Sequence, residues 1–274
     1  MDNLAIISGE GRLPDLIYKE MIRQGVKTWM FYPQNISVKT SDNVNKVIFD
    51  LFDLENLFLQ LRERKIKNVA FAGKITRLNG EHPRPKDLNS IFYKEIYPVL
   101  QSSDDIVLRK IGNLFEAHGF TIKGAVKLLP SSLASGGVLT RENPSLMEGK
   151  DVKKAEFYHN ILSKADIGQS LVVSNGLCLA IETLPGTDAM LDFVKTVKSK
   201  VSLDYSANTG LLYKAPKPNQ DIRFDVPVVG ETTLRKVKEA NLRGIALRKN
   251  CVILLEKQKI IQLADELSLF IINI

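Results

Sequence analysis

The chain has 274 residues, of which 44% are hydrophobic and 25% charged, and its formal net charge is +7. This length accommodates two domains, and the composition is that of a globular protein whose core needs no disulfides. Its two cysteines lie in apolar runs, and we find neither a signal-peptide pattern nor an apolar stretch of about 18 residues, so we expect a cytoplasmic protein without membrane-spanning segments.

The positive net charge favours anionic partners, such as phosphate esters or an anionic bilayer surface. Basic residues are spread along the chain and are not interleaved with aromatic ones, so we expect no nucleic-acid partner. Simple solubility explains the charge equally well.

In the first half, short apolar runs alternate with amphipathic stretches, which predicts a parallel sheet covered by helices on both faces. The expected strands are Leu4–Ser8, Thr28–Tyr32, Val47–Phe49, Val69–Ala72 and Phe120–Ile122. The expected helices are Pro14–Gln24, Leu54–Lys65 and Asp104–His118. The small, turn-rich residues from Pro130 to Gly137 predict a linker between domains spanning residues 1–132 and 137–274.

The second half predicts a mixed α/β domain. Its expected strands include two hairpins, one around Ser174-Asn175-Gly176 and one around Lys249-Asn250. The strands are Val138–Leu139, Ser170–Val173, Leu177–Glu182, Leu211–Tyr213, Ile245–Leu247, Val252–Leu255 and Phe270–Ile274. The helices are Val152–Lys164, Asp188–Lys198, Leu234–Ala240 and Lys257–Leu267.

The first candidate site is Gly9-Glu10-Gly11, between the first strand and the first helix. Glycines there can bring backbone amides close to a phosphate at a helix N-terminus. The full dinucleotide motif is absent, because Pro14 replaces its third glycine and Tyr32-Pro33-Gln34 stands where the ribose-binding acid belongs. A nicotinamide-dependent oxidoreductase is therefore disfavoured, and a tight turn without a ligand is an equal alternative.

The second candidate site is Pro185-Gly186-Thr187-Asp188, which follows a predicted strand. Thr187 suits the N-cap of a helix, with Asp188 in the first turn. The functional alternative is a phosphate bound by the helix amides, or Asp188 bound to a metal, with Glu182 in support.

The third candidate site is the proline-rich stretch from Lys214 to Pro227. In an extended conformation, Asp221, Arg223 and Asp225 would share one side, with neighbours about 7 Å apart. The carboxylates could then hold a cation or orient water, while Arg223 and Lys214 bind phosphate oxygens. A solvated edge strand is the structural alternative.

Histidine chemistry is not expected, because His82, His118 and His159 are scattered without metal-ligand spacing. Any metal should have oxygen ligands, which favours Mg²⁺ or Mn²⁺ over Zn²⁺.

The chain closely resembles the LpxI family almost from end to end. The matching stretches are Ile7–Pro14, Ala72-Gly73-Lys74, Asp104-Asp105, Gly137–Thr140, Asp166–Gln169, Glu182, Gly186–Met190 and, most densely, Lys214–Pro227. The resemblance implies a Mg²⁺-dependent pyrophosphatase of lipid A biosynthesis, which converts UDP-2,3-diacylglucosamine into UMP and 2,3-diacylglucosamine 1-phosphate (lipid X). It implies a Rossmann-like N-terminal domain, a C-terminal domain that supplies catalytic carboxylates, and attack of water on the phosphorus on the sugar side.

From this resemblance we assign the family's essential aspartate to Asp225, with Asp221 as the next candidate. Lys214 and Arg223 complete the expected catalytic set, and Asp188, Asp221 and Asp225 form the expected Mg²⁺ set. Expected substrate contacts come from Gly9, Gly11, Gly186, Thr187, Asp188, Lys217 and Gln220.

The lipid substrate and the basic charge predict peripheral contact with the cytoplasmic face of the inner membrane. The sequence does not determine the oligomeric state, and a homodimer is one of the alternatives. The alternative to an enzyme is a protein that binds UDP-sugar or lipid X without turnover.

Overall fold

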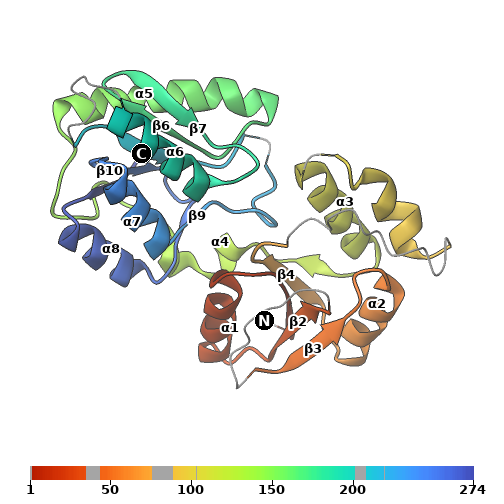
Figure 1. The fold of residues 1–274 in the computed structure, drawn as a ribbon. Helices are drawn as coiled ribbons and strands as arrows, with labels where there is room; N and C mark the ends of the chain where they lie inside the picture. The colour runs from red at the N-terminus through yellow and green to blue at the C-terminus, as the bar shows by residue number, and fades with distance from the viewer. Residues whose placement is uncertain (1, 35–43, 76–88, 103, 201–207, 219) are drawn as a thin grey trace. The chain divides into compact units, whose positions relative to one another are not determined.

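The computed structural model describes residues 2–34, 44–75, 89–102, 104–200, 208–218 and 220–274 (Figure 1). The chain divides into two compact units. The first comprises Met1–Leu129 together with Asp221–Asp225, and the second comprises Pro130–Gln220 and Val226–Ile274. Each unit has its own sheet and hydrophobic core, which confirms the predicted two-domain α/β class.

The first unit contains a five-stranded sheet in the order β3-β2-β1-β4-β5, with every pairing parallel. Its strands are β1 (Leu4–Ser8), β2 (Thr28–Pro33), β3 (Lys46–Phe49), β4 (Asn68–Ala72) and β5 (Thr121–Ile122). From β1 the chain adds β2 and β3 on one side of the sheet, and it then crosses back to add β4 and β5 on the other side, so the strand order reverses between β1 and β4. Open α/β sheets bind ligands outside the carboxyl ends of the strands at such a switch point.

The helices of the first unit follow the predicted apolar periodicity. They are α1 (Leu13–Arg23), α2 (Leu54–Glu63), α3 (Asp104–Ala117) and α4 (Ala125–Leu128), with a π-helical turn at Phe92–Ile96 and a 3₁₀ turn at Tyr97–Val99. In α2, the Asp53 carboxylate caps the helix by accepting from the Asn56 amide at 3.0 Å. The side chains of Leu54, Leu57, Phe58 and Leu61 form its buried stripe.

The second unit contains a mixed sheet in the order β12-β10-β8-β6-β7. Three strands are parallel, and β6 and β7 form an antiparallel hairpin that joins them through β8. Its strands are β6 (Ser170–Ser174), β7 (Leu177–Ile181), β8 (Leu211–Lys214), β10 (Gly244–Leu247) and β12 (Phe270–Asn273). Its helices are α5 (Leu146–Leu162), α6 (Thr187–Lys200), α7 (Glu231–Glu239) and α8 (Lys257–Glu266).

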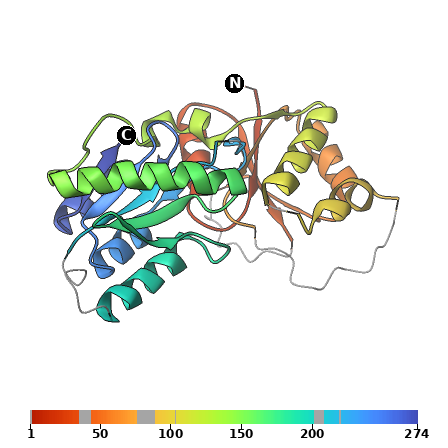
Figure 2. The ribbon, with the colours of Figure 1, turned by 90° about the horizontal axis from the view of Figure 1, so that it is seen from above.

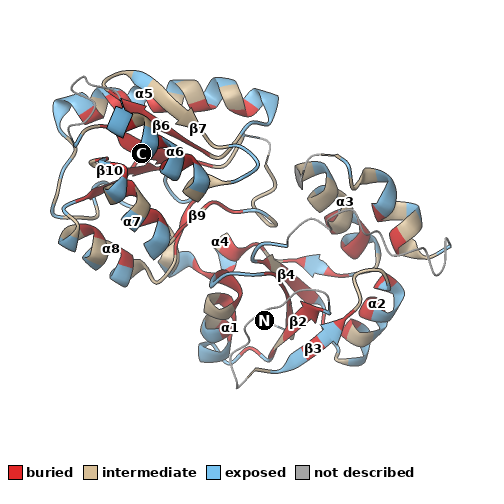
Figure 3. Cartoon of the chain, viewed as in Figure 1, coloured by how far each residue is buried: buried red, intermediate tan, exposed pale blue. Residues whose placement is uncertain are grey.

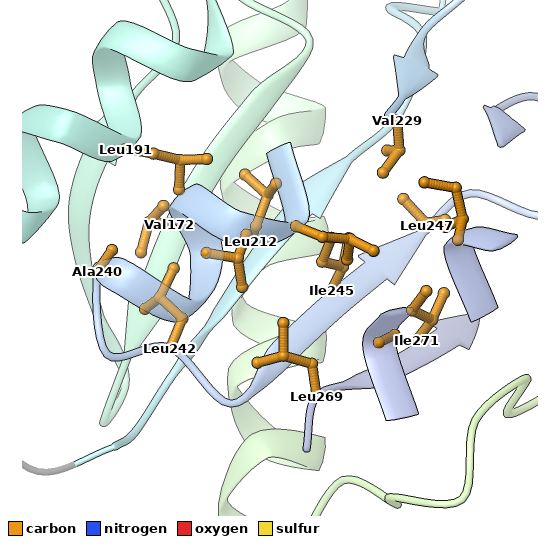
Figure 4. Close-up of a cluster of buried hydrophobic side chains, with 14 of the residues drawn as sticks. Val172, Leu191, Leu212, Val229, Ala240, Leu242, Ile245, Leu247, Leu269 and Ile271 are labelled. Carbon is orange, nitrogen blue, oxygen red and sulfur yellow. The ribbon is translucent and has the colours of Figure 1, made fainter. Parts of the chain in front are cut away.

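Alternate residues of these strands face different helices, so the second unit has three layers. Val172, Leu212 and Ile245 point into a core shared with α6, α7 and α8, which Figure 4 shows in close-up. Leu171 and Tyr213 belong to the opposite cluster, which includes residues of α5. The turned view of Figure 2 shows α5 running along that face of the sheet. The central strands are therefore buried on both sides, as their almost entirely apolar sequences indicate.

The second predicted hairpin is wrong. The strand β10 pairs in parallel with β8 and β12, whereas β11 (Ile253–Leu254) pairs in parallel with β9 (Val228–Val229) in a separate two-stranded sheet. Asn250 does adopt a left-handed turn conformation, with φ of 60°. A turn residue between two apolar runs reverses the chain locally but does not determine which strand each run joins.

Two further boundaries differ from the prediction. The helix α5 begins at Leu146 rather than Val152, because Ser145 and Glu148 form a capping box at its start. The predicted strand Val138–Leu139 is reduced to a single antiparallel bridge between Val138 and Ile272. Among the described residues, none of the helices is both long and apolar enough to cross a bilayer.

Candidate functional site

Lys214 is the centre of a polar cluster in the second unit. Its side chain lies at the end of β8 and the residue is only 4% exposed. The ammonium donates to Thr187 Oγ1 at 2.6 Å and to Ser170 Oγ at 3.0 Å. Glu182 Oε2 lies 3.6 Å from the same nitrogen. A buried cation of this kind is stable because a carboxylate and hydroxyl oxygens surround it.

The topology of the sheet brings these residues together. Ser170 is the first residue of β6 and pairs with Lys214, because β6 runs antiparallel to β8. The Glu182 amide, just beyond β7, donates to the carbonyl of Ser170 at 2.9 Å. Thr187 begins α6 and donates its hydroxyl proton to Glu182 at 2.9 Å. The cluster therefore lies at the carboxyl end of the parallel strands, the usual place for a ligand in an open α/β sheet.

Two glycines shape the approaches to this cluster. Gly168 has φ of 56°, and a Cβ there would lie 2.3 Å from the carbonyl oxygen of Glu182. Gly186, immediately before α6, has φ of 89°. Both are left-handed conformations that favour glycine.

The chemistry of the cluster suits an anion. The first turn of an α-helix presents amides that its own carbonyls do not use, and α6 begins at Thr187, beside the ammonium of Lys214. In a buried setting, hydrogen bonds from a lysine to phosphate oxygens are stronger than in water. Sequence reasoning singled out Lys214, Thr187 and Glu182 but missed Ser170, whose role depends on the strand pairing.

The neighbouring predicted residues have partners of their own. Asp188 accepts from the Thr233 hydroxyl of α7 at 3.3 Å. Lys217 forms an ion pair with Asp166, and its amide donates to the Gln220 side chain at 3.0 Å. The Gln220 side chain thus stabilises the loop after β8. Its contact with substrate stays a prediction.

The segment Asp221–Asp225 is not extended, and the prediction of an acidic and basic row along one side is wrong. The amides of Phe224 and Asp225 both donate to the carbonyl of Asp221, at 3.0 and 3.3 Å, so the segment closes into a turn. Its side chains therefore do not alternate between two faces. The proline-rich flanks suggested a stiff extended strand, but an Asp that bonds to the backbone two residues later favours a turn.

Within this turn, Asp221 is engaged by Arg223. Its carboxylate accepts from the Arg223 amide at 3.0 Å and from the guanidinium at 2.7 to 3.1 Å. These side-chain hydrogen bonds hold the pKa of Asp221 below its usual value. Arg223 also donates to Glu116 of α3 at 2.6 Å. Asp225 lies exposed at the end of the turn.

The turn packs against the sheet and helices of the first unit. The Phe224 ring lies 5.2 Å from the ring of Phe71, measured between centroids. A Cβ on Gly112 of α3 would lie 2.2 Å from Phe224 Cζ, and one on Gly124 would lie 2.9 Å from Arg223 Cα. Both glycines are therefore needed for this close approach, and nothing in their local sequence marks them out.

The glycine loop makes a backbone contact of its own. The amide of Gly9 donates to Ala72, and Glu10 and Lys74 exchange hydrogen bonds at 2.8 and 2.9 Å. A Cβ on Gly9 would lie 2.5 Å from the Lys74 carbonyl oxygen. The small residue thus allows the two loops at the switch point to meet. The backbone amides of Gly9 and Glu10 already donate to carbonyls within this loop region. The amides of Gly11 and of the first turn of α1 are the ones left for the predicted contact with phosphate.

The predicted metal ligands do not gather within one unit. Asp188 belongs to the second unit, whereas Asp221 and Asp225 belong to the first, and Arg223 occupies the oxygens of Asp221. No group of three or more His, Cys, Asp or Glu side chains with metal-site geometry occurs among the described residues. His82 lies outside them, His118 stacks on Phe58, and His159 is buried against the carbonyl of Ala215.

Two family models match the chain consecutively. The model of the LpxI N-terminal domain matches residues 3–132, and that of the LpxI C-terminal domain matches residues 135–272. The chain is also 28% identical, over 274 residues, to a protein of Caulobacter vibrioides (strain ATCC 19089 / CIP 103742 / CB 15) that is named UDP-2,3-diacylglucosamine pyrophosphatase LpxI. That similarity covers 100% of this chain and 98% of the relative.

Proposed function

The chain belongs to the LpxI family, and from this premise we propose that it hydrolyses the diphosphate bond of UDP-2,3-diacylglucosamine. The products are UMP and 2,3-diacylglucosamine 1-phosphate, or lipid X. The observation that carries this proposal is the match of both family domains in order, together with a full-length relative named for that activity. A water oxygen bonds to the phosphorus on the sugar side, and the bond from that phosphorus to the bridging oxygen breaks to release UMP.

Lys214 is our candidate for binding the diphosphate. Its buried ammonium, positioned by the hydroxyl oxygens of Ser170 and Thr187, is a preorganised donor for phosphoryl oxygens. Such donors stabilise the charge that builds on oxygen in the transition state without first having to be reoriented from solvent. Gly186, Thr187 and Asp188 then supply substrate contacts at the start of α6, with Lys217 in the adjoining loop.

Asp225 is our candidate for orienting the attacking water. The family resemblance assigns the essential aspartate to this position, and the residue is exposed. The oxygens of Asp221, the next candidate, are bonded to Arg223. We therefore assign Asp221 to positioning: it holds the turn, and Arg223 links the turn to Glu116 of α3. An ordinary carboxylate is a weak base at neutral pH, so its contribution is to orient water more than to deprotonate it fully.

Mg²⁺ is part of the proposal, although no set of three carboxylates holds it among the described residues. Mg²⁺ commonly binds through one or two carboxylates and the phosphates of the substrate. Asp225 fits as such a ligand because its side chain is exposed. When bound, the ion would neutralise charge on the diphosphate. We also propose that the enzyme contacts the inner membrane peripherally, since its substrate carries two acyl chains.

The test is release of UMP from UDP-2,3-diacylglucosamine by purified protein, with and without EDTA. We expect turnover that EDTA abolishes and added Mg²⁺ restores. Asp225→Asn should remove turnover while leaving binding of lipid X intact. Binding of UDP-sugar or lipid X with no release of UMP under any metal condition would instead establish a binding protein.

A further inference from the structure

The outward side of α5 carries an unusual combination of side chains. Leu146, Met147, Phe157 and Ile161 are exposed at 91, 48, 56 and 52%. Lys150, Lys153 and Lys154 are exposed between them. With 3.6 residues per turn, these positions lie within an arc of roughly 120° along a helix about 25 Å long. We call these seven residues the α5 outer face; Figure 3 shows exposed and buried residues alternating along the helix.

Each acidic residue of α5 has a partner away from the outer face. Glu148 closes the capping box with Ser145. Asp151 is fully buried and accepts from the amides of Asn175 and Gly176. Glu156 stands three residues after Lys153 on the helix, but its carboxylate is engaged by Arg248 at 3.2 Å.

Two lysines on other helices of the second unit have carboxylate partners. Lys195 of α6 pairs with Glu239 of α7, and Lys236 of α7 pairs with Asp192 of α6. Lys150, Lys153 and Lys154 form no ion pair with any residue that the structure describes. Lys154 instead lies over the ring of Tyr158, 5.5 Å from its centroid. The α5 outer face therefore combines exposed apolar side chains with three lysines that form no ion pair among the described residues.

We propose that the α5 outer face is the surface through which this protein docks on an anionic lipid bilayer. Lysines attract acidic headgroups, while exposed leucine, isoleucine and phenylalanine side chains enter the boundary between headgroups and acyl chains. The long lysine stems allow their ammonium groups to stay at headgroup level as the apolar side chains enter. The inference rests on the proposed function only in that a lipid-linked substrate gives such docking a purpose.

Two other occupants fit the surface less well. A second copy of the chain, placed symmetrically on this face, would set lysines against lysines. A nucleic acid would satisfy the lysines but would leave the aliphatic Leu146 and Ile161 without an apolar partner.

The experiment measures cosedimentation of the full-length protein, without substrate, with vesicles of phosphatidylcholine alone or mixed with phosphatidylglycerol. We expect binding only to the anionic vesicles, weakened by salt. In the charge variant, Lys150, Lys153 and Lys154 are replaced by Gln. At about fivefold per lysine, its partitioning should fall on the order of 100-fold. The apolar variant, Phe157→Ser with Ile161→Ser, should bind at least tenfold less.

Matched controls alter the same residue types on other surfaces. Lys19→Gln, Lys67→Gln and Lys127→Gln remove three exposed lysines of the first unit, and Ile22→Ser with Leu59→Ser removes two exposed apolar side chains. Both controls should bind vesicles like the unaltered protein. Circular dichroism verifies that each variant is folded.

Equal vesicle binding by the unaltered protein and both α5 variants would overturn the proposal. So would a change in molecular mass on sedimentation caused by the α5 variants, because the face would then be a subunit interface. With substrate dispersed in detergent, the α5 variants should release UMP at the normal rate. If even the unaltered protein releases no UMP but binds anionic vesicles through this face, the proposed function fails and the docking surface stands.

Discussion

Two lysines are buried among the described residues, and their surroundings differ. Lys214 lies among the hydroxyls of Ser170 and Thr187, with the Glu182 carboxylate nearby. Lys198 of α6 donates to the carbonyls of Thr209 and Asn241, at 2.9 and 2.7 Å. The Lys214 ammonium can exchange its hydroxyl partners for the oxygens of an incoming anion. The Lys198 ammonium instead links two chain segments by bonding to their backbone carbonyls.

For Lys214, replacement by Met should lower kcat for UMP release on the order of 100-fold, since a preorganised donor to the reacting oxygens is lost. Lys249→Met, which alters an exposed lysine of the same unit, is the control and should leave kcat unchanged. Steady-state kinetics of both variants provide the measurement. An unchanged kcat in Lys214→Met would show that this ammonium is structural.

Because Lys198 is buried, we expect the stability of the protein to depend on pH. Burial lowers the pKa of its side chain to about 8. Above that pH the folded protein has lost a proton that the unfolded chain keeps until its ordinary, higher pKa is reached. The unfolded state therefore binds more protons, and the free energy of unfolding should rise as pH increases through this window.

Urea unfolding at several pH values above 7 measures this effect. In Lys198→Met the increase with pH should be absent, while Lys195→Met on the exposed side of α6 should retain it. The same slope in all three proteins would contradict the assignment to Lys198.

At the scale of elements, α5 packs on β6 through Val152 and Ala155, and the Asp151 side chain adds hydrogen bonds to the turn of the β6–β7 hairpin. Asp151 accepts from the amides of Asn175 and Gly176 at 3.0 and 2.7 Å. These two turn residues have φ of 51° and 78°, as a tight antiparallel hairpin requires. Burial raises the pKa of Asp151 and the two amides lower it. The helix thus fixes the turn that sets the register of β6, and with it the position of Ser170.

Asp151→Ala should reduce the free energy of unfolding by about 2 to 3 kcal/mol, because two amides lose a buried acceptor. Chemical denaturation gives this value. Asp192→Ala removes an exposed carboxylate from α6 and should cost less than about 1 kcal/mol. Equal losses in the two variants would argue against a specific role of the Asp151 contacts.

At the scale of the whole molecule, the chain leaves the second unit, contributes Asp221–Asp225 to the first unit and then returns. Phe224 anchors the segment Asp221–Asp225 in the first unit, because its ring packs against Phe71 and Gly112. Lys214 and Asp225, which are near one another in sequence, consequently belong to different compact units.

Phe224→Ala should weaken the first unit by about 2 kcal/mol, because a half-buried aromatic ring is lost. Hydrogen exchange should accelerate in β4 and α3 but not in β8 and β10. Phe193→Ala, an exposed position on α6, should change neither region. Faster exchange throughout the molecule would show that the excursion stabilises both units.

Most helices and strands were predictable because their signals are local. The periodicity of Leu54, Leu57, Phe58 and Leu61 indicated α2, and Asn175-Gly176 indicated the hairpin between β6 and β7. The start of α5 was missed although its signal, Ser145 with Glu148, was present. The turn at Asp221 was missed because flanking prolines favour extension equally well.

The sequence by itself determined the α/β class, the family, and most of the residue types at the candidate site, since each depends on local patterns or on the order of residues along the chain. Only the tertiary structure decided that β10 joins a parallel sheet, that Ser170 and Glu182 meet Lys214, and that Asp221–Asp225 packs on the first unit. Each of these depends on contacts between segments far apart in sequence. Such contacts are selected by the packing of complete sheets and helices, and no short motif specifies them.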